Sequence, residues 1–456
     1  MLKKIVSWSL VALMLVMFAG CGKKGTENGN SNADASSNAS QTESSNISEI
    51  TGMLDIKIKK GEVKKFVSNR AHDNSKEDIS IILVTGQSNF TKGIGYAAEY
   101  SALVSGKTDN VPEEPVRPQK GIAYSCNTAA PLTDLTKEYD MYYLCDSSND
   151  VSTLSGVTPS FAIKWNALTG TKVVFVQAAV GGVGMHEWVP NTADYVCNCG
   201  NSEKMLYLKA VTAYKTVYAA LSKKYNIVYT GYIWNQGEHD ENYSIAGNTI
   251  KEAQNYYDAY KSMHEGFMRE LNLDFGGISV VRSYMNGKTA MGSRSYTIAR
   301  AAQYELCNSI DNLYMLSTMS ETCSRDMMDQ GNTIHYSQRV LNKMGAEMAT
   351  NLHNRLGLSA QAAQYSGIKL YTNNGEVVAG FDATGKLTEG KGKINKNTQK
   401  NIIFHLDTLG TADIVSAEVN IGQKNGEKYI DSFGEIDWEA LKDAGIEELT
   451  VKVTVE

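Results

Sequence analysis

Between residues 78 and 357, short apolar runs alternate with longer segments in which apolar residues recur every three or four positions. The short runs predict buried strands, and the longer segments predict amphipathic helices. The predicted strands are Ile79–Thr85, Lys172–Gln177, Ile227–Trp234, Ile278–Arg282 and Leu313–Ser317. The predicted helices are Thr158–Leu168, Ser202–Tyr225, Ile250–Leu271, Tyr296–Cys307 and Ser337–Leu356. This alternation predicts an α/β domain with a parallel sheet covered by helices on both faces.

The pattern changes after Leu358, where short strands and Gly/Asn turns follow one another. The predicted strands are Ile368–Tyr371, Glu376–Phe381, Ile402–His405, Ile414–Val419 and Leu449–Val455, with one short helix at Trp438–Asp443. We therefore expect a separate β-rich accessory domain over residues 359–456. Tyr371, Tyr429 and Trp438 are its candidates for stacking on a sugar. So few aromatic candidates favour a spacer or packing role over polysaccharide binding.

The N-terminus has the pattern of an export signal. Lys3 and Lys4 precede an apolar run over Ile5–Ala19, which is too short to span a membrane comfortably. The junction Phe18-Ala19-Gly20-Cys21 resembles a bacterial lipoprotein signal, although such signals usually have Leu where Phe18 stands. The resemblance implies cleavage after residue 20 and lipidation of Cys21. A plain secretory signal followed by a chance cysteine is the alternative.

Residues 22–50 are polar and small, with almost no apolar side chains. Such a segment cannot bury enough surface to offset its ordering entropy. The expected organisation is a signal peptide at 1–20, a disordered tether at 21–50, an α/β domain at 51–358 and the β-rich domain. We expect the protein on the extracellular face of the cell membrane, held there by the lipid on Cys21.

Charge and cysteine content narrow the range of partners. The chain of 456 residues has 44 Lys and Arg against 50 Asp and Glu, a net charge of −6, which argues against a nucleic-acid partner. Six cysteines follow Cys21, and in an exported protein they form either disulfides or buried thiols. The Cys197-x-Cys199 spacing is not that of a zinc knuckle, so we expect no metal site.

Three predicted strands end in residues suited to chemistry, and the working residues of parallel sheets lie at such ends. The first strand ends in Gly86-Gln87-Ser88-Asn89, which presents a serine on a tight turn. The second ends in a turn with Gly181 and Gly182, whose backbone amides can point at a bound oxygen. Trp188, a little further on, can floor a sugar pocket or pack in the core.

The third strand leads into Gln236-Gly237-Glu238-His239-Asp240, which places amide, carboxylate and imidazole groups at the same edge. His335 precedes the last predicted helix of the domain. A histidine there is often only a cap or a surface residue. Here it matters because the serine at the first strand end needs a base.

Taken together, these four motifs resemble, in order and spacing, the SGNH-type hydrolases of the sialate O-acetylesterase and carbohydrate esterase family 6 group. The resemblance covers about residues 78 to 357. It implies a three-layer α/β/α fold and hydrolysis of acetyl esters on sugars, with no metal and no organic cofactor. It also implies Ser88 as nucleophile and His335 as base, and an oxyanion hole formed by the amides of Ser88 and Gly182, with Gly181 beside it, and by the Gln236 side chain. Gln87, Asn89, Trp188 and His239 are expected to contact the substrate.

One position departs from the family pattern. Many SGNH hydrolases carry an aspartate three residues before the histidine, whereas this chain has Asn332, which cannot supply the charge that stabilises an imidazolium. Glu238 of the Gln-Gly-Glu motif is the favoured replacement. Asp329 or Asp326 is a second possibility, and a third is that Asn332 or a backbone carbonyl merely holds the histidine tautomer.

The leading hypothesis is therefore a membrane-tethered carbohydrate acetylesterase whose partner is an acetylated carbohydrate. The alternative, motivated by Asn332, is a catalytically weak sugar-binding surface lipoprotein on the same fold. A lipid or thioester hydrolase is a third reading, but no apolar lid segment supports it.

Overall fold

The structure is a computed structural model. It describes residues 53–58, 65–107, 111–135, 140–141, 155–190, 205–243, 250–282, 284–285, 294–295, 297–322, 328, 335–358, 364–372, 377–382, 384–395, 402–409, 418–421, 441, 443 and 445–455. The predicted signal peptide, the tether and Cys21 lie outside these residues. In the described part of the chain, no helix is long and apolar enough to cross a membrane.

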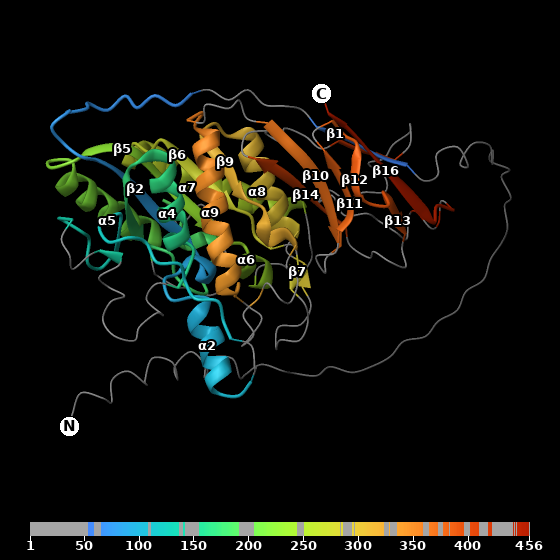
Figure 1. Cartoon of the computed structure of the whole chain (residues 1–456), viewed down its shortest axis with the longest axis horizontal. Coiled ribbons are helices and arrows are strands. Elements are labelled where there is room, and N and C mark those ends of the chain that lie inside the picture. Colours follow the sequence, from blue (N-terminus) through green and yellow to red (C-terminus); the bar gives the residue numbers. More distant parts are fainter. Residues whose placement is uncertain are drawn as a thin grey trace. The chain divides into compact units, whose positions relative to one another are not determined.

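A six-stranded parallel sheet forms the centre of the α/β domain (Figure 1). Its order is β3 (Ala123–Asn127), β4 (Lys172–Gln177), β2 (Asp78–Gly86), β5 (Asn226–Asn235), β6 (Phe275–Ser279) and β9 (Leu313–Ser317). From β2 the chain crosses to β3 at the edge of the sheet, returns to β4 beside β2, and then continues at β5 on the other side of β2. The direction of winding therefore reverses between β2 and β5, and such a switch point is where α/β sheets place their ligand sites.

Five of these strands were predicted, and two of them, β4 and β9, have the predicted bounds. The predicted strand Ile278–Arg282 was placed too late, because β6 begins at Phe275. The edge strand β3 was not predicted; its residues, AYSCN, contain polar side chains that hide the apolar pattern.

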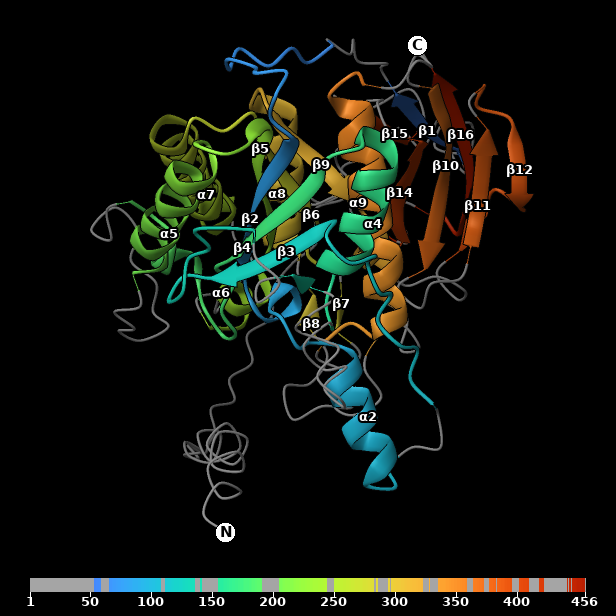
Figure 2. The same ribbon diagram turned by 60° about the vertical axis from the view of Figure 1, so that its left-hand side comes forward.

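Helices cover both faces of the sheet, so the predicted three-layer α/β/α fold is confirmed (Figure 2). On one face lie α4 (Thr158–Thr169) and α9 (Gln338–Arg355), which also pack against each other. On the other face lie α5 (Leu206–Leu221), α7 (Ile250–Leu271) and α8 (Thr297–Ser309). The helix α9 begins at a cap in which the Ser337 side chain accepts a hydrogen bond from the Val340 amide.

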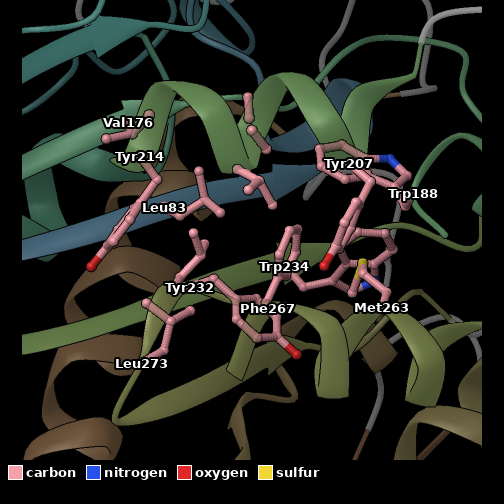
Figure 3. Packing of buried hydrophobic residues seen from close by; sticks show 14 of the residues in the cluster. Leu83, Val176, Trp188, Tyr207, Tyr214, Tyr232, Trp234, Met263, Phe267 and Leu273 are labelled. Carbon is pink, nitrogen blue, oxygen red and sulfur yellow. The ribbon is translucent and has the colours of Figure 1, made fainter. Parts of the chain in front are cut away.

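Each face of the sheet has its own apolar core. The core under α5 and α7 is rich in large aromatic side chains, including Trp188, Tyr207, Tyr232, Trp234 and Phe267 (Figure 3). Trp188 and Trp234 meet edge to face, with ring centroids 5.4 Å apart. Each fully buried side chain of this size contributes about 1.5–3 kcal/mol from burial alone. These residues therefore hold β5, which carries part of the candidate site, firmly in the sheet.

Shorter elements follow the strands of the α/β domain at several points. They are η1 (Ser88–Phe90), α2 (Tyr96–Val104), η4 (Met185–Glu187), α6 (Glu238–Tyr243), β7 (Tyr284–Met285), β8 (Arg294–Ser295) and η6 (Met319–Thr322). Two of them, η1 and α6, begin directly after β2 and β5 and carry residues of the candidate site.

The C-terminal strands form two further sheets. One has the order β12 (Leu387–Gly390), β11 (Val377–Asp382), β10 (Gln364–Thr372) and β14 (Ile402–Leu409). The other has the order β13 (Lys393–Asn395), β16 (Glu448–Val455), β1 (Met53–Ile58) and β15 (Glu418–Ile421). The C-terminal region is therefore β-rich. Tyr429, Trp438 and most of the predicted helix Trp438–Asp443 lie outside the described residues.

The strand β1 does not lie in the domain to which the sequence assigned it. The predicted boundary placed residues from 51 onward in the α/β domain. The strand pairs in parallel with β16 and antiparallel with β15, so it belongs to a C-terminal sheet. The prediction failed here because strand pairing between distant segments leaves no local mark in the sequence.

Candidate active site

The candidate site lies at the carboxyl edge of the sheet, where β2, β4 and β5 end side by side. Gly86 ends β2 with a φ of +107°, and a Cβ atom there would lie 2.1 Å from the Asn235 carbonyl oxygen. Only glycine allows this close approach. The Gln87 amide then donates to the same Asn235 oxygen (2.9 Å), and Ser88, half-buried, opens η1. The turn is thus fixed against the end of β5.

The glycine turn after β4 lies directly beside Ser88. A Cβ atom built on Gly181 would be 3.6 Å from the Cβ of Ser88. Gly181 and Gly182 are both exposed, Gly182 has a φ of +66°, and the Val180 amide donates to the Gly86 carbonyl (3.3 Å). Exposed backbone therefore borders the serine on the side where the sequence predicts the oxyanion hole.

Gln236 is completely buried, and its side chain is held from both ends. Its Nε2 donates to the carboxylate of Asp240 and to the Val183 carbonyl (3.2 Å), while its Oε1 accepts from the Tyr256 hydroxyl (3.1 Å). Two acceptors on one side and a donor on the other fix the orientation of the amide. Both Nε2 hydrogens therefore have acceptors within the protein, and the oxyanion contact expected of Gln236 stays a prediction.

Asp240 joins the ends of two strands. Besides Gln236, its carboxylate accepts from the Met185 amide at 3.1 Å (Oδ1) and 3.0 Å (Oδ2). Met185 opens η4, which follows the glycine turn, so one buried carboxylate ties that turn to the segment after β5. The sequence places Asp240 in the polar run after β5 but gives it no role.

Tyr256 and Gln303 support Gln236 from the helices α7 and α8. The Tyr256 hydroxyl donates to the Gln236 carbonyl (3.0 Å) as well as to its side chain, and Gln303 Nε2 donates to the same carbonyl (2.7 Å). Burial raises the pKa of Tyr256, and the nearby charge of Asp240 raises it further. The hydroxyl therefore stays protonated and remains a donor at physiological pH.

Asn89 connects the serine turn to the histidine segment. Its Nδ2 donates to Glu238 Oε1 (3.0 Å), and its Oδ1 accepts from the backbone amide of Tyr336 (3.1 Å). Asn89 directly follows Ser88, and Tyr336 directly follows His335. The hydrogen bond between Asn89 and Tyr336 therefore ties together the two segments that carry the predicted reacting residues. His335 is half-buried at this edge.

Arg282, just beyond β6, pairs with the carboxylate of Glu238. Its Nη2 lies 3.6 Å from Glu238 Oε1, both side chains are at most 3% exposed, and its guanidinium lies 5.8 Å above the Tyr336 ring. The role expected of Glu238 in orienting His335 stays a prediction. The oxygen Oε1 faces Asn89 and Arg282, and Oε2 has no hydrogen-bond partner within the described part of the chain.

Three of the expected substrate contacts are also corrected by burial. Asn89 and Trp188 are both 0% exposed, and Trp188 packs in the aromatic core rather than flooring a sugar pocket. Gln87 is 5% exposed, and its Oε1 accepts from the His239 amide (3.2 Å), so it braces α6. His239 is half-buried, and its expected substrate contact stays a prediction.

The other expected residues lie outside the described part of the chain. These are Asn332, Asp326 and Asp329, and the cysteines Cys145, Cys197, Cys199 and Cys323. Cys126 is a buried free thiol, and burial raises its pKa to about 11. Cys307 is half-buried. Among the residues that the structure describes, no group of three or more His, Cys, Asp and Glu side chains is placed to hold a metal ion.

The fold and this edge define the general class of the protein. An SGNH-type hydrolase has three features that this chain shares. A serine turn lies at the switch point of a three-layer α/β/α fold, exposed glycines lie beside the serine, and a histidine segment is hydrogen-bonded to the same turn. The family model for "Carbohydrate esterase, sialic acid-specific acetylesterase" matches residues 78–354. The chain therefore belongs to this family of carbohydrate esterases.

Solved structures with a similar fold share 14% sequence identity with the chain. A protein from Arabidopsis thaliana matches with 60% of this chain and 96% of its own (TM-score 0.38). XAC1771, a carbohydrate acetylesterase from Xanthomonas citri, matches with 82% of this chain and 79% of its own (TM-score 0.39). NanS matches with 59% of this chain and 95% of its own (TM-score 0.35). A search of curated proteins finds no match.

Proposed function

We propose that this protein removes acetyl groups from carbohydrates, with Ser88 as nucleophile and His335 as general base. Family membership supports the reaction class. The observation that carries the residue assignment is the position of Ser88 between the exposed glycine turn and the histidine segment.

In the proposed reaction, Ser88 Oγ attacks the acetyl carbonyl carbon while His335 accepts the hydroxyl proton. The tetrahedral intermediate then collapses as His335 returns this proton to the sugar oxygen, which leaves as an alcohol. Water, deprotonated by His335, attacks the acetyl ester on Ser88 and releases acetate. Each proton is taken and returned by the same imidazole, so the site is regenerated after one cycle.

The oxyanion is proposed to accept hydrogen bonds from the backbone amides of Ser88 and Gly182. Gly181 lies at the same turn, and its missing side chain leaves the approach to Ser88 open. Gln236 can add a third bond by exchanging its 3.2 Å contact with the Val183 carbonyl for the oxyanion. Its bond to Asp240 would then keep the amide in place during the exchange.

The direct test is acetate release by the purified full-length protein and by Ser88→Ala. The substitution should lower kcat at least about 1,000-fold, because the nucleophile is lost. Ser75→Ala, at an exposed serine before β2, is the matched control and should retain wild-type activity. Equal acetate release by wild type and Ser88→Ala would refute the assignment.

The substrate is proposed to be an acetylated sugar or polysaccharide outside the cell. Acetylated xylan, O-acetylated sialic acids and acetylated glucosamine sugars form a panel whose kcat/KM values would identify it. The alternative function, a sugar-binding surface lipoprotein, is motivated by Asn332 in place of the expected aspartate. Binding of a panel sugar without any Ser88-dependent acetate release would support that alternative.

A lipid anchor on Cys21 is proposed from the signal-like junction and the polar segment behind it. Cys21→Ser should release the protein from the membrane fraction or leave its signal uncleaved. Membrane retention of a Cys21→Ser protein with a mature-sized N-terminus would show that the anchor is elsewhere.

A further inference from the structure

A chain of buried polar contacts runs from the serine turn to the histidine segment. Asn89 is its centre, because one side-chain amide reaches both Glu238 (3.0 Å) and the Tyr336 backbone (3.1 Å). Asn89 is fully buried and Glu238 is 3% exposed, so no solvent competes for these bonds. Hydrogen bonds of this kind are strong in a low-dielectric interior and costly to leave unmade.

The Asn89 side chain has only one orientation that satisfies both partners. The Tyr336 N–H must meet the oxygen Oδ1, and the Glu238 oxygen Oε1, an acceptor, must meet the nitrogen Nδ2. Glu238 therefore selects the orientation in which Asn89 can hold the residue after His335. A rotated amide would place a donor against the Tyr336 N–H and release it.

The carboxylate of Glu238 pairs with the Arg282 guanidinium. The Arg282–Glu238 separation is 3.6 Å, and the Arg282 guanidinium also lies over the Tyr336 ring at 5.8 Å. Arg282 thus contacts both the carboxylate that orients Asn89 and the residue that Asn89 holds. The three side chains come from the ends of β2, β5 and β6, so they join three strand ends at the histidine segment.

We propose that Asn89 and Glu238 are positioning residues that place His335 next to Ser88 through the backbone of Tyr336. This inference rests on the proposed function, in which these two residues react. In this arrangement Glu238 acts through the orientation of an amide, and its negative charge serves Arg282. The arrangement replaces the sequence-based expectation that Glu238 stabilises the imidazolium directly.

The decisive experiment exchanges donor and acceptor between positions 89 and 238. In Asn89→Asp, two carboxylates face each other in a buried site, and kcat should fall about 100-fold, as expected when a reacting group moves by about 1 Å. In Asn89→Asp/Glu238→Gln, the aspartate accepts from both Tyr336 N–H and the new glutamine amide. This double variant should recover to within about tenfold of wild type.

Two further variants separate orientation from charge. Glu238→Gln and Glu238→Ala both remove the negative charge, but only the glutamine keeps an oxygen for Asn89 Nδ2. We expect a loss in kcat of less than about tenfold for Glu238→Gln and about 100-fold for Glu238→Ala, with KM nearly constant in both. A direct role of the charge on His335 would instead cost about 10⁴-fold in Glu238→Gln.

Each outcome is read against folded controls. Asn312→Asp and Glu77→Gln make the same chemical changes at the amino edge of the sheet and should behave as wild type. Equal losses in Glu238→Gln and Glu238→Ala overturn the proposal, as does a double variant no more active than Asn89→Asp at an unchanged Tm. These readouts need a wild-type rate that depends on Ser88, so a wild type equal to Ser88→Ala marks failure of the proposed function instead.

Discussion

Two arginine–carboxylate pairs, one part-buried and one fully buried, lie at opposite edges of the same sheet and are built very differently. At the amino edge, Arg70 Nη1 donates to Asp274 Oδ2 at 2.7 Å, and Nη2 donates to Thr230 Oγ1 (2.5 Å) and to the Asn272 carbonyl (2.8 Å). The Thr230 amide donates to the same Asp274 oxygen (2.8 Å). This pair is close and is surrounded by further hydrogen bonds.

At the carboxyl edge, Arg282 and Glu238 lie 3.6 Å apart. Glu238 Oε2 and Asn235 Oδ1 are buried and make no hydrogen bond to any residue that the structure describes. Buried polar atoms without a hydrogen-bond partner cost stability. Native proteins therefore keep them mainly at functional sites, where the function offsets that cost. The amino-edge pair also leaves one such atom, Arg70 Nε, but is otherwise held by close hydrogen bonds, as expected of a pair that stabilises the fold. The carboxyl edge combines a wider pair with unmet acceptors beside the candidate site.

The comparison predicts opposite phenotypes for the two edges, and its largest effect falls on stability. Asp274→Ala leaves the largely buried Arg70 guanidinium without its carboxylate and should lower the free energy of unfolding by about 3–5 kcal/mol. The kcat of the folded fraction should not change. Chemical denaturation and active-site-normalised kinetics measure both, and a fall in kcat as large as that of a carboxyl-edge variant would erase the distinction.

At the carboxyl edge, Gln236→Ala tests whether Gln236 Nε2 leaves the Val183 carbonyl during the reaction and donates to the oxyanion instead. Loss of one oxyanion donor should lower kcat on the order of 100- to 1,000-fold, with KM nearly constant. Steady-state kinetics on one acetylated substrate measures both parameters. An effect confined to KM would make Gln236 a substrate contact, and a loss below tenfold would leave the oxyanion to backbone amides alone.

A third polar group, the buried side chain of His264, lies between the two edges and makes stability depend on pH. His264 Nδ1 meets the Tyr232 hydroxyl at 2.8 Å, and burial lowers the pKa of His264 from 6.5 to about 4. Below pH 6.5, His264 binds a proton in the unfolded chain but stays neutral in the folded chain. The free energy of unfolding therefore falls as the pH drops from 6.5 to about 4.

This loss should reach about 3 kcal/mol and should be absent in His264→Phe, while kcat is retained. Denaturation curves recorded across this pH range provide the measurement. Tyr232 keeps the Tyr260 hydroxyl as partner at 3.1 Å, which makes the substitution a mild one. An equally steep pH dependence in His264→Phe would assign the proton uptake to other groups.

The smallest predicted effect concerns the tie between the glycine turn and Gln236. Asp240→Asn retains an oxygen for the Met185 amide but turns a second donor toward Gln236 Nε2. We expect about a tenfold decrease in kcat, with Tm lowered only slightly. A Tm that falls without any change in kcat would place Asp240 with the stabilising residues of the amino edge.

Much of the α/β domain could be predicted because buried parallel strands and amphipathic helices leave local periodicities. The β6 strand was misplaced because it begins with Phe275-Gly276-Gly277, and glycine weakens the strand pattern. Gly277 is needed there, since a Cβ atom would lie 2.1 Å from Leu316 Cδ1. That requirement comes from a neighbouring strand and is invisible in the sequence of β6.

The candidate site shows the same limit. The strand-end rule located Ser88, Gly181 and Gly182, since the carboxyl ends of β2 and β4 meet in space. The partners of Glu238 and Gln236 could not be predicted, because Arg282 and Tyr256 come from other elements. The family resemblance suggested Glu238 as the acid beside His335, and it could not reveal the ion pair of Glu238 with Arg282. For Trp188 the sequence left a sugar pocket and the core open, and the structure places it in the core.

The pairing of β1 has a consequence for how the protein bears load. Met53 of β1 is aligned with Thr450 of β16, so the first described strand is clasped by the last, with the whole α/β domain between them in the chain. A pull on the N-terminal side of β1 acts along the strand and loads its hydrogen bonds to β15 and β16 together, in shear. Under such a pull, this C-terminal sheet should therefore bear the force before the α/β domain does. Single-molecule stretching from the N-terminus should unfasten β1 before the central sheet yields.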